Sequence, residues 1–273
     1  MTRIETTFNE LGDQEAALVT YMMGGYPTVE GSLDVARALI NGGADILEVG
    51  VPFSDPIADG PIIQSAAKKA LESGASLRKV LKICRMVRED YSVPIVLMGY
   101  LNPIYQMRCE RFFQEAHASG LDGVIIPDLP MEESNNLRMI ARAHGIDVIL
   151  LAAPSTSQVR LSKIASYTSG FLYLVSVYGV TGPRRSIGRS IKYVKRAVHT
   201  VAGRVPLSVG FGVSNPRQVE EIVKAGADGV VVGSSLISEL QKSSNCSKRV
   251  LNRLRTRTSW LKKSTTLRPR ASK

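Results

Sequence analysis

Short apolar runs alternate with amphipathic stretches along most of the chain. The apolar runs begin near residues 17, 46, 94, 123, 148, 171, 206 and 229. The stretches between them, such as GSLDVARALI and RQVEEIVKA, place apolar positions at helical spacing. The pattern predicts eight strands with helices between them.

A glycine and an aspartate precede several of these runs, in GGADILEVG from residue 42, SGLDGVIIPD from 119, HGIDVILL from 144 and AGADGVVVG from 225. Glycine commonly ends a helix in the left-handed conformation. A strand of a parallel sheet, buried on both faces, is a continuous run of Val, Ile and Leu. The repeated unit is therefore a helix, a tight turn and a parallel strand.

Eight such units in residues 1–240 are the number that forms a (β/α)8 TIM barrel, and we predict a single α/β domain of this fold. A doubly wound open sheet is the alternative, but no GxGxxG motif follows the first predicted strand. Residues 241–273 are expected to form a basic C-terminal helix or tail, partly disordered.

The net charge of +11 is confined to this C-terminal segment. Residues 241–273 hold 11 of the 35 basic residues and none of the 24 acidic ones, so the rest of the chain is neutral. We interpret the segment as the last barrel helix with a solvated basic end. Contact with nucleic acid or an acidic partner is the alternative. Nucleic acid is the less expected partner, because Trp260 is the segment's only aromatic residue.

The three cysteines, Cys84, Cys109 and Cys246, are widely spaced, with no CxxC pair and no histidine cluster. This spacing argues against a disulfide framework and a zinc site, and it suits a reducing compartment. No apolar run approaches the roughly 20 residues of a membrane-spanning helix, and the N-terminus lacks a signal-peptide core. We expect a cytoplasmic protein without membrane contact or a metal site.

The stretch EVGVPFSDPIADGP begins with Glu48, inside the predicted strand DILEVGVP. Alternation turns Leu47 and Val49 one way and Glu48 the other, and one of those directions is the barrel interior. Burial raises the pKa of a carboxyl group, which tunes a general acid or base toward neutral pH. The alternative is a structural glutamate bonded to hydroxyl groups or to an arginine.

Asp55 and Asp59 follow in a loop that three prolines stiffen. Because helix starts and turns favour aspartate, each alone is explained as a cap or a turn residue. In a barrel, however, the active site forms at the C-terminal ends of the strands and in the loops that follow them. The loop therefore lies where chemistry is expected.

Glycine-rich junctions follow the last three predicted strands, in YGVTGPRRS, VGFGVSN and VVGSSLI. Backbone N–H groups and a helix N-terminus bind anions, and barrels commonly bind phosphate after strands seven and eight. With Ser234 and Ser235 as further donors, the junctions predict a phosphorylated substrate. Alternatively, the glycines only permit tight turns. The first junction is also long enough to act as a closing lid.

Five motifs, EVGVPFSDPIADGPIIQ, PDLPMEES, GVTG, GFGVS and GADGVVVGS, in this order resemble the alpha subunit of tryptophan synthase. The match covers roughly Leu18 to Ile237. The resemblance implies a carbon–carbon lyase of tryptophan biosynthesis that cleaves indole-3-glycerol phosphate to indole and glyceraldehyde 3-phosphate by a retro-aldol reaction. It implies that Glu48 and Asp59 are catalytic, Glu48 by proton transfer and Asp59 by accepting a hydrogen bond from the ring N–H.

The resemblance also implies a set of substrate-binding residues. They are Tyr21, Tyr100, Tyr173, Thr181, Gly182, Gly212, Gly233 and Ser234. The last four of this set would contact phosphate, and Thr181 would meet the Asp59 loop. Asp128 matches an interface position. The motif TYMMGGYP, and Tyr178 and Pro183 in the lid, depart from the family's usual pattern.

The implied partner is the beta subunit in an alpha2beta2 heterotetramer, which receives the indole. Pyridoxal phosphate is expected only in that beta subunit, and no cofactor is expected in this chain. With no lysine at an evident strand end and no cluster of metal ligands, neither Schiff-base nor metal-assisted cleavage is expected. A free-standing lyase and a non-catalytic regulatory barrel are the alternatives.

Overall fold

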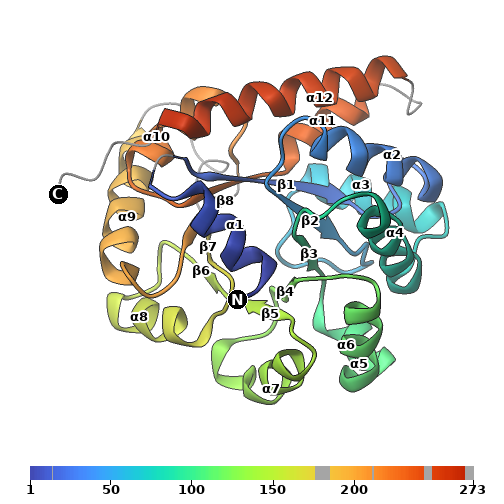
Figure 1. The fold of residues 1–273 in the computed structure, drawn as a ribbon, viewed down its shortest axis with the longest axis horizontal. Helices are drawn as coiled ribbons and strands as arrows, with labels where there is room; N and C mark the ends of the chain where they lie inside the picture. Colours follow the sequence, from blue (N-terminus) through green and yellow to red (C-terminus); the bar gives the residue numbers. More distant parts are fainter. Residues whose placement is uncertain (14, 176–184, 211, 243–247, 268–273) are drawn as a thin grey trace.

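The computed structural model describes residues 1–13, 15–175, 185–210, 212–242 and 248–267. The strands of these residues are all parallel and pair in the order β5-β4-β3-β2-β1-β9-β8-β7-β6. They are β1 (Ala17–Met23), β2 (Ile46–Gly50), β3 (Ile95–Met98), β4 (Gly123–Ile125), β5 (Asp147–Ile149), β6 (Leu151–Ala152), β7 (Leu172–Val175), β8 (Leu207–Gly210) and β9 (Gly229–Val232). The sheet curls into a nearly closed barrel surrounded by helices, which confirms the predicted TIM barrel (Figure 1).

The fifth predicted strand is interrupted at Leu150, between β5 and β6. Side-chain hydroxyl groups replace the backbone partners there. The N–H of Val148 donates to Ser169 Oγ and the N–H of Leu150 donates to Thr168 Oγ1, both at 2.9 Å. The carbonyl of Leu150 still accepts the N–H of Tyr173 at 3.0 Å. Strands β5 and β6 together therefore form the fifth strand of the barrel.

Helices cover the outside of the barrel, and the apolar core lies between them and the strands. They are α1 (Arg3–Leu11), α2 (Val29–Ile40), α3 (Pro61–Glu72), α4 (Leu77–Asp90), α5 (Leu101–Met107), α6 (Cys109–Ala118), α7 (Asn135–Ala143), α8 (Gln158–Tyr167), α9 (Arg185–Val201), α10 (Pro216–Lys224), α11 (Ser234–Gln241) and α12 (Lys248–Lys263), with short 3-10 helices η1 (Met131–Glu133) and η2 (Ser264–Leu267). Within the described ranges, no helix has the length and apolarity needed to cross a membrane.

The predicted tight turns in front of the strands are present. Gly43, Gly120, Gly145 and Gly226 have φ between 68° and 99°, the left-handed region in which glycine is unstrained. Each lies in the segment between a helix and the following strand. The helix, turn and strand unit of the sequence pattern is therefore confirmed.

Three of the aspartates that follow these glycines bond to neighbouring strands. Asp45 accepts the N–H of Leu18 at 2.7 Å, Asp122 that of Ile95 at 2.8 Å, and Asp228 that of Leu207 at 2.8 Å. Each carboxylate thus satisfies a backbone donor near the start of the preceding strand in the sheet. The repeated aspartate is therefore a structural feature of the barrel's N-terminal end.

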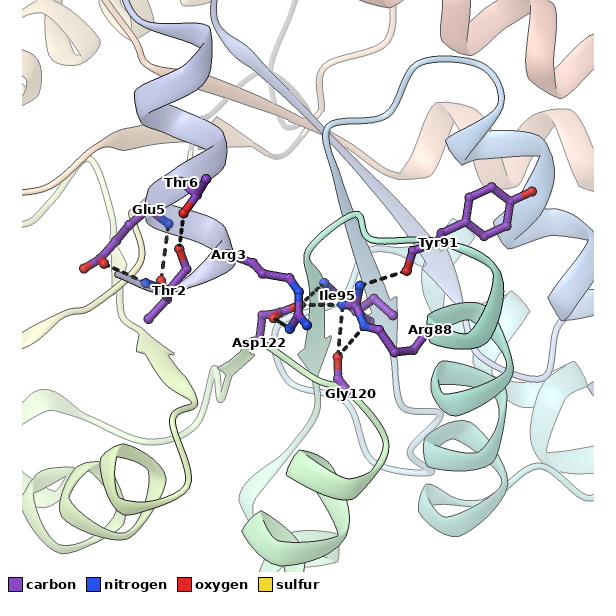
Figure 2. A network of polar contacts seen from close by, with 9 residues as sticks. All are labelled: Thr2, Arg3, Glu5, Thr6, Arg88, Tyr91, Ile95, Gly120 and Asp122. Carbon is purple, nitrogen blue, oxygen red and sulfur yellow. Dashed lines mark hydrogen bonds and ion pairs between the residues drawn. The ribbon is translucent and has the colours of Figure 1, made fainter.

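Helix α1 is tied to this same end of the barrel through Asp122, as Figure 2 shows. Asp122 accepts hydrogen bonds from Arg3 at 2.8 Å and from Arg88 at 2.6 Å. Arg88 also donates to the carbonyl of Gly120 at 3.0 Å. The buried side chain of Phe8 meets Phe171 with ring centroids 5.9 Å apart. Helix α1 therefore lies at the end of the barrel opposite the C-terminal ends of the strands.

Helix α12 lies within the basic segment 241–273 and packs against the turn between α2 and β2. Lys262 donates to Glu15 at 3.1 Å and to Asp45 at 2.8 Å. A Cβ added at Gly42 would lie 2.6 Å from Thr258 Cβ, so the glycine permits the close approach. The division of the chain at residue 240 into a barrel and a C-terminal segment stays a prediction.

Candidate active site

Glu48 lies in the middle of β2, with its side chain in the barrel interior. Its register partners are Tyr21 on β1 and Val96 on β3, and the residue is only 1% exposed. Oε2 is buried and has no hydrogen-bond partner among the described residues. A purely structural glutamate would be expected to bond through this atom to a hydroxyl group or an arginine. Burial, and then the charge of Asp59, raise the pKa of Glu48 to about 8. At neutral pH Glu48 is therefore a protonated acid.

Asp59 reaches the same region from the loop that follows β2. The Tyr100 hydroxyl donates to Asp59 Oδ2 at 3.1 Å and accepts the N–H of Ala58 at 3.0 Å. The Tyr100 ring stacks on Phe53, with centroids 5.0 Å apart and an interplanar angle of 29°. One tyrosine therefore holds the loop at three points.

Burial raises the pKa of Asp59, while the hydrogen bond from Tyr100 lowers it. Burial also raises the pKa of Tyr100 to about 12, so its phenol stays neutral and can donate to the carboxylate. Tyr100 therefore orients Asp59, and its predicted contact with substrate stays a prediction.

A small cavity brings most of the predicted site residues together. Its lining includes Tyr21, Glu48, Asp59, Tyr173, Gly212, Gly233 and Ser234. The volume is about 30 Å³, room for on the order of two water molecules. Burial raises the pKa values of Tyr21 and Tyr173 well above that of an ordinary tyrosine, which leaves both phenols neutral.

Ile63, Met98 and Val231 also line this cavity and were not predicted. Met98 pairs in register with Gly50 at the end of β3, and Val231 lies within β9. In runs that are apolar on both faces, alternation gives no sign of which residues face inward. Ile63 follows the Asp59 loop in α3 and carried no signal beyond its apolar character.

The predicted phosphate side lies at the C-terminal ends of β8 and β9. Gly212 follows β8 with φ of 76°, and Gly233 directly precedes Ser234, the first residue of α11. The first backbone N–H groups of a helix have no partner inside the helix and attract anions. Ser235 Oγ is buried without a hydrogen-bond partner in the described part of the chain. The arrangement is suited to an anion.

Four of the other residues singled out in the sequence are not described by the structure. Thr181, Gly182, Tyr178 and Pro183 lie outside the described residues. Ser54 Oγ bonds to Asp55, which agrees with a role in the loop.

Asp128 accepts the N–H of Leu101, the first residue of α5, at 3.0 Å. Within this chain its carboxylate therefore satisfies a backbone donor at a helix start.

Comparison with known proteins identifies relatives along nearly the whole chain. The family model described as "Tryptophan synthase alpha chain" matches residues 8–266. The tryptophan synthase alpha chain of Methanosarcina mazei is 43% identical over 249 residues, covering 91% of this chain and 90% of the relative. That of Carboxydothermus hydrogenoformans is 44% identical over 242 residues, covering 88% of this chain and 90% of the relative.

Solved structures agree. Tryptophan synthase subunit alpha of Legionella pneumophila superposes with a TM-score of 0.88 at 33% identity, covering 97% of this chain and 98% of that one. A chain from the aminoacrylate-bound tryptophan synthase of M. tuberculosis gives 0.85 at 32% identity, with 97% and 100% covered. The fold, the paired carboxyl groups and these matches lead to one conclusion: the chain belongs to the tryptophan synthase alpha chain family.

Proposed function

We propose that the cavity around Glu48 and Asp59 cleaves indole-3-glycerol phosphate to indole and glyceraldehyde 3-phosphate, the lyase reaction of this family. One observation carries the assignment of the catalytic residues. A buried carboxyl group in the barrel interior, Glu48, lines the same cavity as a second carboxyl group, Asp59, which accepts a hydrogen bond from Tyr100. Burial raises the pKa of Glu48 to about 8, which suits it to proton transfer.

The proposed reaction begins with transfer of the Glu48 proton to the indole ring carbon that carries the side chain. Positive charge develops at the ring nitrogen, and Asp59 stabilises it by accepting the N–H hydrogen bond. The Glu48 carboxylate then removes the proton of the side-chain hydroxyl. The carbon–carbon bond breaks, its electron pair returns to the ring, and the hydroxyl carbon becomes the aldehyde. Glu48 ends protonated, as it began.

Binding of the substrate is assigned to the other predicted residues. Tyr21 and Tyr173 line the catalytic cavity and would pack against the indole ring. Gly212, Gly233 and Ser234 would bind the phosphate, mainly through backbone N–H groups. For Gly182 as a further phosphate contact and Thr181 as the partner of the Asp59 loop, the support is the sequence motif alone.

The proposed partner is a tryptophan synthase beta subunit, with two copies of each chain in the complex. That subunit would carry the pyridoxal phosphate and receive the indole. Support comes from family membership and from the M. tuberculosis structure, which is a tryptophan synthase.

The test is release of indole from indole-3-glycerol phosphate by the purified chain, with and without a beta subunit. Glu48→Gln and Asp59→Asn are each expected to lower kcat by at least about 100-fold, the scale of a lost acid–base or electrostatic contribution. Asp55→Asn, in the same loop, is the matched control and should retain most of the activity.

The alternatives predict other outcomes. Full activity without a beta subunit would identify a free-standing lyase. No indole under any condition, from a folded chain that still binds the beta subunit, would contradict catalysis and leave a regulatory barrel.

A further inference from the structure

Only part of the basic C-terminal segment serves to attach α12 to the barrel. Of its 11 lysines and arginines, Lys262 bonds to Glu15 and Asp45, and Arg255 donates to the carbonyl of Asn41 at 3.2 Å. These contacts attach α12 on the side of α2. On another side of α12, Arg253 and Arg257 approach Glu239 of α11, and Arg249 forms no ion pair with any described residue.

Those arginines line a groove beside α11, here called the α12 groove. Arg249, Arg253 and Arg257 form one row along α12, spaced one helical turn apart, and Glu239 of α11 lies beside them. A second row consists of Asn252, Thr256 and Trp260, and Trp260 is 54% exposed. The groove is wide and open to solvent, with a volume of about 690 Å³.

Charge in the α12 groove is unbalanced. Glu239 is the only acid among the described residues of its lining, and three cations approach that one carboxylate: Lys242 at 2.8 Å, Arg253 at 3.5 Å and Arg257 at 3.9 Å. The hydrogen bond from Lys242 is the main cause that lowers the pKa of Glu239, so the carboxylate is ionised. Arg249 forms no ion pair with any described residue. Positive charge therefore exceeds negative charge throughout the groove.

Arg257 adds a donor inside the groove wall. Its Nη2 donates to the carbonyl of Ser214 at 2.7 Å, which fixes the guanidinium. Its Nε is buried and has no hydrogen-bond partner in the part of the chain that the structure describes. Because this nitrogen is not accessible from the groove, the contribution of Arg257 to the groove is its positive charge.

We propose that the α12 groove binds an acidic segment of a partner protein. Carboxylates pair with arginine through two parallel hydrogen bonds, and exposed tryptophan and arginine are the side chains that dominate protein interfaces. From Arg249 to Trp260 the helix rises about 16 Å, the length of about five residues of an extended chain. Such a segment would place its carboxylates at Arg249 and Arg253 and an apolar side chain on Trp260.

The aromatic content of the groove favours a peptide over nucleic acid. Single-stranded nucleic acid binds along several aromatic side chains on which successive bases stack, whereas Trp260 is the only aromatic residue among the described residues that line the α12 groove. A peptide needs one apolar side chain on Trp260 and carboxylates at the arginines.

Because Trp260 is the only tryptophan of the chain, its fluorescence reports binding directly. The full chain would be titrated with a short synthetic peptide in which aspartate alternates with leucine. We expect a saturable blue shift of the emission and a dissociation constant that rises with salt. The double variant Arg249→Ala/Arg253→Ala is expected to weaken binding by at least about tenfold. Lys263→Ala, an exposed basic residue of the same helix outside the groove, should leave it unchanged.

Three results would overturn the proposal: no change in Trp260 emission, equal binding by the wild type and the double variant, or tighter binding of a single-stranded oligonucleotide than of the peptide. The last would assign the groove to nucleic acid. Circular dichroism of each variant checks that α12 remains folded. The experiment does not depend on the lyase reaction.

Discussion

The hydroxyl group of Tyr21 occupies the space that a side chain at Gly50 would fill. A Cβ added at Gly50 would lie 2.1 Å from the Tyr21 hydroxyl oxygen. Tyr173 and Gly210 repeat the relationship at 2.4 Å. In each case the tyrosine is on one strand and the glycine ends the neighbouring strand. Both cavity tyrosines therefore depend on a glycine for their position.

Gly50→Ala is expected to displace Tyr21 and to lower kcat/KM by at least about tenfold, with a loss of stability of about 1–3 kcal/mol from overpacking. Tyr21→Leu shortens the clashing side chain. The double variant should therefore lose less stability and less kcat/KM than the sum of the losses of the two single variants. Steady-state kinetics and urea unfolding of the four proteins test this. Strict additivity would contradict it.

Glu48→Gln should stabilise the protein at neutral pH. In the native state Glu48 holds its proton up to a pKa of about 8, against an ordinary value of 4.5 in the unfolded chain. The unfolded state therefore binds fewer protons between these values, and Glu48 lowers stability as pH rises through this window. At pH 7 the variant should gain on the order of 3 kcal/mol in the free energy of unfolding. Urea unfolding should show this gain at pH 7 and not at pH 4; an equal gain at both would refute the cause.

The pH dependence of the reaction should have a basic limb set by Glu48. Because the proposed first step needs the protonated carboxyl group, kcat/KM should fall about tenfold per pH unit above the pKa of about 8. The measurement is kcat/KM for indole release across the pH range. An increase through this region would mean that ionised Glu48 begins the reaction.

Tyr100→Phe should move the acidic limb of the same profile to higher pH. The hydrogen bond from Tyr100 lowers the pKa of Asp59, so its loss raises that pKa and delays formation of the carboxylate. Tyr105→Phe, in the exposed part of α5, is the control. A uniform loss of activity without a shift of the limb would show that Tyr100 acts on the loop alone.

Asp122→Asn should lower stability and leave the chemistry unchanged. The carboxyl group is 5% exposed and pairs with Arg88, which is 16% exposed, so its neutralisation leaves a largely buried cation unpaired. The expected loss is about 3 kcal/mol in the free energy of unfolding. Arg37→Ala, which breaks an exposed pair with Asp90, should lose about 1 kcal/mol or less. A loss in kcat at temperatures where the protein is folded would contradict this separation.

Much of the barrel could be predicted because the turns before four of the strands have a local signature. Gly43, Gly120, Gly145 and Gly226 mark the strand starts within the sequence itself. The break at Leu150 could not be predicted, because the hydroxyl groups that cause it belong to Thr168 and Ser169, well away in the chain. Its cause is tertiary.

The candidate site divides in the same way. A charged residue in an apolar run, Glu48, stands out in the sequence, as does an aspartate in a proline-rich loop. Met98 and Val231 do not, because every residue of their runs is apolar. The hydrogen bond from Tyr100 to Asp59 joins residues 41 positions apart, and the sequence gives no sign that they are in contact.

The aspartates at the N-terminal end of the barrel also link neighbouring strands in pairs. Asp45 joins β2 to β1, Asp122 joins β4 to β3, and Asp228 joins β9 to β8. A chain divided between α3 and α4 would keep each of these three bonds inside one fragment. A division between β3 and β4 would separate Ile95 from Asp122. Fragments that reassemble into an active barrel are therefore expected from the first division rather than the second.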